Sequence, residues 1–212
     1  MLTTTEARAR ILAAVRPLPG ETVPLSATLG RVLVTGAIAE RDQPPFDRVM
    51  MDGIALRFSE YDALERSFPI QGTQMAGDAP LTLEAGHCIE IMTGAALPEG
   101  ADLVIPVEQI TVNNGAAHVQ ANYMAEPRQF IHPRGSDYHK GKELLRPGTR
   151  IRPMDVAILA SCGLADVEVA ALPAVTVIST GDELVPAGTS IEPQQIRMSN
   201  GPAVVAMLAE HG

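Results

Sequence analysis

Hydroxyl and carboxylate side chains follow a short apolar segment near the end of the chain, at Ser179-Thr180-Gly181-Asp182-Glu183. Residues 174–178 favour a strand that ends at this turn. Ligands of open α/β sheets bind outside the carboxyl ends of strands, where turn amides approach phosphates and carboxylates bind Mg²⁺. The pattern predicts a ligand-binding turn. The alternative is the acidic first turn of an ordinary surface helix.

A second group of charged side chains lies at residues 44–53, where Asp47 and Asp52 flank Arg48. Two carboxylates at this spacing could hold a cation or orient an oxyanion. Pro44-Pro45 stiffens the approach, and Asp52-Gly53 is typical of a turn. A domain hinge whose aspartates only cap turns is the alternative.

Two further segments carry polar groups beside a glycine. Thr93-Gly94 ends the apolar run Ile91-Met92, so its hydroxyl and exposed amides could bind an oxyanion. Arg134-Gly135-Ser136-Asp137 places a cation and a carboxylate around a flexible residue and could approach a phosphate or a metal. An ordinary turn and a solvated loop remain the respective alternatives. The five histidines have no metal-ligand spacing and are interpreted as surface or loop residues.

The elements that position these groups differ along the chain. Thr3 and Glu6 predict a capping box at the start of a helix that Pro17 to Gly20 ends. A short helix from Ser26 and a strand at 32–34 follow. Residues 38–134 alternate short apolar stretches with turns, which predicts a compact β module with a hairpin at Asn113-Asn114-Gly115. A helix at 154–161 begins after Pro153, and another at 203–209 begins after a Ser199 or Asn200 cap.

Composition excludes several classes of function. Sixteen Lys and Arg against 25 Asp and Glu give a formal net charge of −9, which disfavours nucleic acid as a partner. No window approaches 18 consecutive apolar residues, so no membrane span is predicted. Cys88 and Cys162 match no metal or redox motif and are typical of buried residues in a reducing cytoplasm. The expected location is cytoplasmic.

Taken in order, these motifs resemble the molybdopterin molybdenumtransferase family, which includes the MoeA proteins and the E domain of gephyrin. The resemblance extends over essentially the whole chain. The segments that carry it are Gly30-Arg31-Val32-Leu33, Pro45-Phe46-Asp47 with Met51-Asp52-Gly53, Ile91-Met92-Thr93-Gly94-Ala95 with Leu97-Pro98-Glu99-Gly100-Ala101-Asp102, Arg134-Gly135-Ser136-Asp137 with Lys140-Gly141, Gly148-Thr149-Arg150, Ser179-Thr180-Gly181-Asp182-Glu183-Leu184, and Gln195-Ile196-Arg197 with Ser199-Asn200.

The resemblance implies an α+β, multi-domain fold. A mixed linker domain would comprise residues 1–45 and 135–172, with a small β-rich module inserted at 46–134. Residues 173–212 would be the truncated start of an α/β molybdopterin-binding domain. The chain is therefore expected to be an N-terminal portion that is inactive alone.

The resemblance also implies a function: insertion of molybdate into adenylylated molybdopterin, with release of AMP and molybdenum cofactor. Members act as homodimers with the active site between subunits, and molybdoenzyme clients are further expected partners. The family's catalytic positions correspond here to Asp52, Thr93, Asp137 and Glu183. Mg²⁺ would be bound by Asp52, Asp137 and Glu183, and substrate by Ser179, Thr180, Gly181 and Asp182.

The chain departs from the family pattern immediately before Met51-Asp52-Gly53. Family members usually have Asn-Ser-Ala at the three positions where this chain has Arg48-Val49-Met50. A small amide and a hydroxyl are replaced by a cation and two apolar side chains. A noncatalytic dimerisation or scaffold paralogue, or a molybdopterin carrier, is therefore the alternative function.

Overall fold

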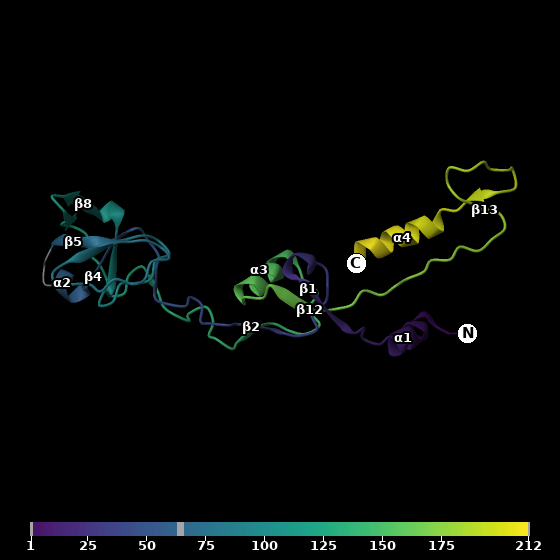
Figure 1. Cartoon of the computed structure of the whole chain (residues 1–212), viewed down its shortest axis with the longest axis horizontal. Helices are drawn as coiled ribbons and strands as arrows, with labels where there is room; N and C mark the ends of the chain where they lie inside the picture. The colour runs from purple at the N-terminus through teal and green to yellow at the C-terminus, as the bar shows by residue number, and fades with distance from the viewer. Residues whose placement is uncertain (1, 63–65, 212) are drawn as a thin grey trace. The chain divides into compact units, whose positions relative to one another are not determined.

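The computed structural model describes residues 2–62 and 66–211, which form two compact units. One unit comprises Ala39–Lys142, and the other comprises Met1–Ile38 with Glu143–Gly212. Figure 1 shows the elements of each unit along the chain. The mixture of helices and sheets agrees with the α+β class expected from the sequence. The division into a linker domain, an inserted module and the start of an α/β domain stays a prediction.

A six-stranded sheet with the order β7-β4-β6-β5-β9-β8 forms the centre of the unit 39–142. Its neighbouring strands are antiparallel except for β5 and β6, which are parallel. A separate two-stranded ladder pairs β3 with β10. The elements of this unit are β3 (Arg48–Val49), β4 (Gly53–Leu56), α2 (Phe58–Asp62), β5 (Ser67–Gln74), β6 (Cys88–Ile91), β7 (Leu103–Pro106), the 3₁₀ helix η2 (Val107–Gln109), β8 (Ile110–Asn113), β9 (Ala116–Val119) and β10 (Ile131–His132).

Strand β4 is buried along its whole length because the sheet is covered on both faces. Successive side chains of a strand point to opposite faces, so Ile54 and Leu56 enter one apolar cluster and Ala55 the other. All three are 0% exposed. This two-sided burial explains why the strand reads as a continuous apolar run.

The hairpin predicted at Asn113-Asn114-Gly115 is confirmed. β8 ends at Asn113 and β9 begins at Ala116, and the two strands are antiparallel. Asn114 and Gly115 have positive φ angles of 51° and 76°. Such angles suit the tight turns that follow the twist of a two-stranded ribbon.

The other unit contains a smaller apolar core around Leu33, Ile151, Leu159 and Val169. β1 pairs antiparallel with β12, β2 with β11, and β13 pairs parallel with β14. Its elements are α1 (Thr4–Ala14), β1 (Gly20–Pro24), the 3₁₀ helix η1 (Leu25–Ala27), β2 (Ala37–Ile38), β11 (Glu143–Leu145), α3 (Pro153–Ser161), β12 (Asp166–Ala170), β13 (Leu184–Val185), β14 (Ile196–Arg197) and α4 (Asn200–His211).

Several local predictions in this unit hold and others fail. The capping box joins Thr3 and Glu6 at the start of α1, and α3 begins at Pro153. The helix predicted from Ser26 is only a 3₁₀ turn, and in the predicted strand 32–34 only Val32 and Leu33 form isolated bridges. Among the described residues, no helix is long and apolar enough to cross a membrane.

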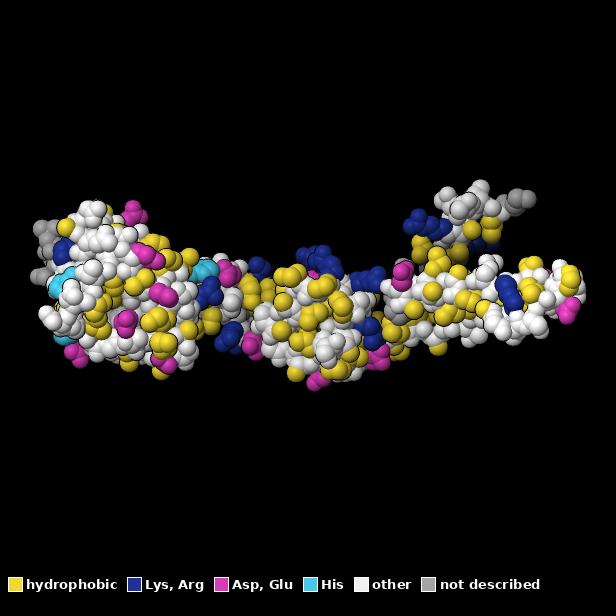
Figure 2. All heavy atoms as spheres, turned by 90° about the horizontal axis from the view of Figure 1, so that it is seen from above, with side chains coloured by type: hydrophobic (Ala, Val, Ile, Leu, Met, Phe, Trp, Pro, Cys, Tyr) yellow, Lys and Arg dark blue, Asp and Glu magenta, His cyan; other side chains and the backbone are white. Residues whose placement is uncertain are grey.

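The strand predicted at 174–178 is wrong. These residues belong to no strand, and Val175 and Ile178 are 55% and 78% exposed. A strand requires hydrogen bonds to a neighbour, and no described segment pairs with 174–178. Figure 2 shows hydrophobic side chains, in yellow, on the face of the molecule that it presents.

Candidate functional site

Asp52 and Thr93 lie close together at one end of the strands β4 and β6, because these two strands are paired. β4 begins at Gly53 and β6 ends at Ile91, and these residues are partners in the antiparallel ladder. Asp52 therefore lies close to Thr93, which follows β6. The backbone N–H and the hydroxyl of Thr93 both donate to Asp52 Oδ1, each over 2.7 Å. Two of the predicted catalytic residues thus form one hydrogen-bonded pair.

These hydrogen bonds favour the charged form of Asp52. The Thr93 hydroxyl, and after it the Thr93 amide, lowers the pKa of the Asp52 carboxyl below its usual range. The side chain lies on an exposed residue, so water reaches the carboxylate. Within the described part of the chain, Oδ2 accepts no hydrogen bond. Asp52 thus presents an ionised oxygen to solvent.

The glycine after Asp52 begins a central strand. The sequence predicted a turn at Asp52-Gly53, and the chain does bend at Met51 and Asp52 before β4 begins. A Cβ at Gly53 would lie only 1.9 Å from the carbonyl oxygen of Ile105 in the neighbouring strand β7. Glycine is required here because the two backbones approach so closely.

Strand β3 is hydrogen-bonded to the turn that contains Thr93 and Gly94, which is called the Thr93 turn below. Val49 donates from its amide to the carbonyl of Ala95 over 2.9 Å, and Gly94 donates back to the Val49 carbonyl over 2.9 Å. On its other side β3 pairs with β10, where Arg48 is opposite His132. β3 therefore links the Thr93 turn to the segment that precedes Asp137.

Asp137 is held by both its backbone and its side chain. Its amide donates to the carbonyl of Gln43 over 2.9 Å, and its Oδ1 lies 3.1 Å from His132 Nε2. Arg48 Nη2 lies 3.1 Å from the other ring nitrogen of His132, Nδ1. His132, interpreted from the sequence as a surface or loop residue, lies in strand β10, not in a loop, and its side chain is 26% exposed.

Two further aspartates bond to the segment 134–140: Asp47, which the sequence analysis named as a possible cation or oxyanion group, and Asp42, which it did not name. Asp47 accepts from Arg128 over 2.6 Å and from the Arg134 amide over 2.8 Å. Partial burial acts to raise the pKa of Asp47, but these two bonds outweigh it and hold the pKa below normal. Asp42 accepts from the Lys140 amide and from Arg134 Nε, and both bonds lower its pKa. No spacing pattern could reveal these contacts, since the partners lie more than 80 positions apart.

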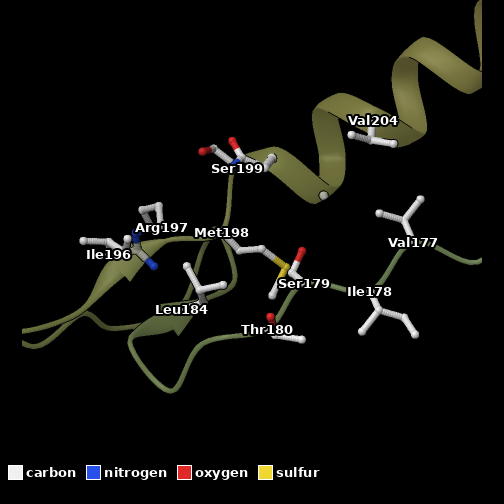
Figure 3. Close-up of a pocket in the computed structure, with 12 residues that line it drawn as sticks. Val177, Ile178, Ser179, Thr180, Leu184, Ile196, Arg197, Met198, Ser199 and Val204 are labelled. Carbon is white, nitrogen blue, oxygen red and sulfur yellow. The ribbon is translucent and has the colours of Figure 1, made fainter. Parts of the chain in front are cut away.

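The turn at 179–183 lies in the other unit, beside the start of α4. A cavity of about 300 Å³ is lined there by Ser179, Thr180, Arg197, Ser199 and Asn200 together with apolar residues. Figure 3 shows this cavity between the first turn of α4 and the segment 177–180.

Glycines at 181 and 201 permit close approaches around this turn. A Cβ at Gly181 would lie 2.6 Å from Glu183 Oε2, so the Glu183 carboxylate folds back over the turn. A Cβ at Gly201 would lie 2.7 Å from Ser179 Oγ. The turn therefore packs against the start of α4, where the Ser179 hydroxyl lies next to the backbone of Gly201.

The predicted site residues are thus divided between the two units. Asp52, Thr93 and Asp137 lie within 39–142, whereas Glu183 and the predicted substrate residues Ser179 to Asp182 lie within the other unit. In the described ranges, no three His, Cys, Asp or Glu side chains come together as a metal-binding group.

Comparisons with known proteins agree on one family. Residues 2–163 match the family model described as the MoeA N-terminal region (domain I and II). The molybdopterin molybdenumtransferase of Synechocystis sp. is 39% identical over 180 residues, which cover 84% of this chain and 46% of that protein. The Synechococcus elongatus protein of the same name is 35% identical over 203 residues, covering 92% and 50%.

Solved structures give the same result. A molybdopterin biosynthesis MoeA protein from Pyrococcus horikoshii superposes with a TM-score of 0.82 at 32% identity and covers 100% of this chain and 55% of that chain. A second structure of the protein from that organism gives 0.85 at 30% identity. The chain spans about half the length of the curated relatives that it matches. Family model, relatives and structures together establish that this chain belongs to the MoeA family and contains its N-terminal region.

Proposed function

We propose that this chain supplies the N-terminal part of an enzyme that inserts molybdate into adenylylated molybdopterin, with release of AMP and molybdenum cofactor. The names of its relatives, molybdopterin molybdenumtransferases, support a role in molybdenum cofactor biosynthesis. The main support for the proposal is the Asp52–Thr93 pair, in which Thr93 orients an ionised and exposed Asp52 carboxylate. We assign catalytic roles to Asp52, Thr93, Asp137 and Glu183.

Thr93 has two proposed tasks that follow from its hydrogen bonds. Its amide and hydroxyl orient the Asp52 carboxylate. A hydroxyl has one hydrogen to donate, and here Asp52 accepts it. Binding of an oxyanion such as molybdate by the Thr93 hydroxyl therefore requires this group to turn away from Asp52, while the amide maintains its bond.

We further propose that Asp52, Asp137 and Glu183 hold Mg²⁺. The donor chemistry fits, because Mg²⁺ prefers carboxylate oxygens, needs only one or two of them beside substrate phosphates, and keeps several waters. Both Asp52 and Asp137 are exposed residues. When bound, the ion would neutralise charge on the phosphate bridge of the adenylate. The chain's own part is to hold the carboxylates in fixed positions before substrate arrives.

The cavity at the turn 179–183 supports a role in substrate binding. It lies at the N-terminus of α4, a helix of 12 residues, and such helix ends favour anions because their amides and dipole face the ligand. Ser179, Thr180 and Ser199 add hydroxyl groups to its wall. We propose that Ser179, Thr180, Gly181 and Asp182 contact the adenylylated molybdopterin there.

The test is reconstitution of cofactor formation with the complete gene product, adenylylated molybdopterin, molybdate and Mg²⁺. Asp52→Asn keeps the shape of the side chain but removes its charge, so cofactor release should fall steeply. Asp78→Asn is the matched control, because Asp78 is an exposed carboxylate whose side chain, within the described ranges, accepts only from the Met75 amide. Equal rates for the two variants, or cofactor release that survives removal of Mg²⁺ by a chelator, would contradict the proposal.

A noncatalytic scaffold or a molybdopterin carrier is the second candidate function. The observation that favours it lies at residues 48–50, where Val49 is buried and the Arg48 guanidinium contacts His132. No hydroxyl or amide side chain is offered to an anion at these three positions. Under this alternative the complete gene product would bind molybdopterin without releasing cofactor from the adenylate.

We also propose that the protein acts in the cytoplasm as a homodimer and passes cofactor to molybdoenzyme clients. Helix α1 supports the dimer, because none of its residues is buried and its apolar Ile11 and Leu12 are 65% and 60% exposed. Contiguous exposed apolar patches, rather than single exposed side chains, mark surfaces that a partner covers.

A further inference from the structure

Arg48, His132 and Asp137 form a continuous chain of polar contacts. Arg48 in β3 and His132 in β10 are direct partners in an antiparallel ladder, so their side chains are neighbours on one face. Arg48 Nη2 lies 3.1 Å from His132 Nδ1, and His132 Nε2 lies 3.1 Å from Asp137 Oδ1. The imidazole therefore bridges a cation and a carboxylate through its two nitrogens.

The partners of the ring determine which nitrogen carries the hydrogen. A guanidinium group donates hydrogen bonds and never accepts them, so Nδ1 of His132 must be the acceptor. A neutral imidazole that accepts at Nδ1 carries its hydrogen on Nε2. The hydrogen is then carried by the nitrogen that lies 3.1 Å from Asp137 Oδ1. Arg48 thus selects the tautomer in which the N–H is next to Asp137.

Asp137 has two contacts with neighbouring segments. Its amide is bonded to the Gln43 carbonyl, and its Oδ1 lies 3.1 Å from His132 Nε2. A hydrogen bond from the Nε2–H ring would restrict rotation of the carboxylate. The side chain remains 45% exposed, so an incoming group can reach it.

We propose that His132 is the positioning residue for Asp137, and that Arg48 acts through His132 by fixing its Nε2–H tautomer. This rests on the proposed function for the part that Asp137 plays in catalysis. It gives a purpose to Arg48, the cation at one of the positions where the chain departs from the usual family residues. Removal of a residue that orients a ligating carboxylate typically lowers metal affinity or activity by about 10- to 100-fold.

The first experiment reads the tautomer directly, by ¹⁵N NMR of the histidine rings in the 212-residue chain well above the ordinary histidine pKa of about 6.5. We expect His132 to show a bare Nδ1 and a protonated Nε2. His87 is an internal contrast, because its Nδ1 faces the Ala85 carbonyl over 2.9 Å and must donate. Arg48→Met should leave His132 as a mixture of tautomers. An Nδ1–H form of His132 in the unaltered chain overturns the proposal.

The second experiment compares His132→Gln with His132→Leu in the complete gene product. A glutamine amide can accept from Arg48 through its oxygen and donate to Asp137 through its nitrogen, as the Nε2–H ring does. Leucine fills similar space without either group. We expect His132→Leu to lower the rate of cofactor formation about 10- to 100-fold and His132→Gln to restore most of it. Equal rates for the two variants overturn the proposal, provided that both melt at similar temperatures.

The controls separate failure of this proposal from failure of the proposed function. His87→Leu should leave the rate unchanged, since the bond of the His87 ring that the described residues show lies within its own turn. If the unaltered protein forms no cofactor, the proposed function fails, and the positioning role is then judged by the ¹³C shift of the Asp137 carboxylate. That shift should change in His132→Leu and return in His132→Gln, and an unchanged shift in both variants overturns the role.

Discussion

Thr93 donates two hydrogen bonds, from its amide and its hydroxyl, to the same carboxylate oxygen of Asp52, each over 2.7 Å. Such a doubly held oxygen is fixed in orientation, and the bonds stabilise its charged form. The pair exists because the strands next to each residue are paired in register. Any change to this register would separate the two side chains.

Thr93→Val should raise the pKa of Asp52 toward the ordinary aspartate value of about 3.9. The substitution removes the hydroxyl, which is the larger cause of the lowered pKa, and leaves the amide bond in place. Titration of the carboxylate ¹³C signal by NMR measures the change. Thr73→Val is the matched control, because its hydroxyl donates to Glu90 on the same sheet. An unaltered Asp52 titration in Thr93→Val would show that the hydroxyl bond is absent in solution.

Asp47→Asn should destabilise the protein at neutral pH but not in acid. Because the folded-state pKa of Asp47 is lowered, its charged form stabilises the fold above the ordinary aspartate pKa of about 3.9. That contribution is lost as the pH falls through the folded pKa. Urea unfolding at a series of pH values should therefore show the wild-type and variant stabilities converging below about pH 4.

The control for this series is Asp166→Asn in β12, a residue that forms no ion pair within the described ranges. At neutral pH the free energy of unfolding of this variant should differ from wild type by a smaller amount than that of Asp47→Asn, because no ion pair is lost. A constant gap for Asp47→Asn across the whole pH range would mean that the bonds to Arg128 and Arg134 contribute nothing in solution.

Gln74→Leu should lower the free energy of unfolding by about 1–3 kcal/mol for the polar groups that it leaves without partners. Gln74 is 0% exposed; its Nε2 donates to the Ala96 carbonyl over 2.6 Å and its Oε1 accepts from the Leu81 amide over 2.8 Å. Both partners would stay buried or partly buried after the substitution. Denaturant unfolding measures the effect.

Gln71→Leu provides the matched comparison on the same strand. Its side chain makes the same kind of bridge, to the Thr82 carbonyl and the Glu84 amide, but these bonds are exposed to water. Water can replace them, so the cost should be smaller than for Gln74→Leu. Equal costs would show that burial is not the cause of the Gln74 effect.

Leu12→Glu in α1 should shift the proposed homodimer toward monomer. Leu12 is 60% exposed on a helix that has no buried residue, so a charge there costs little within one chain but would disrupt an apolar contact between two. Light scattering after size-exclusion chromatography gives the mass. Ala9→Glu, at another exposed position of α1, tests whether added charge alone has the same effect. A wild-type monomer would refute the dimer.

Features that depend on a few neighbouring residues could be predicted from the amino-acid sequence. Thr3 and Glu6 cap a helix, Asn114-Gly115 forms a hairpin turn, and Pro153 begins a helix, because each involves bonds and backbone angles within one turn. The family resemblance likewise followed from the order of short motifs, and the family comparisons confirm it.

The contacts between side chains that lie far apart in the sequence could not be predicted and became known only from the tertiary structure. Thr93 and Asp52 are 41 positions apart, and His132 and Arg48 are 84 apart. Their contacts follow from the register of strands β4 with β6 and of β3 with β10, which no local pattern encodes. The same physics explains the failed strand at 174–178, since an apolar, β-branched segment becomes a strand only where a partner supplies hydrogen bonds.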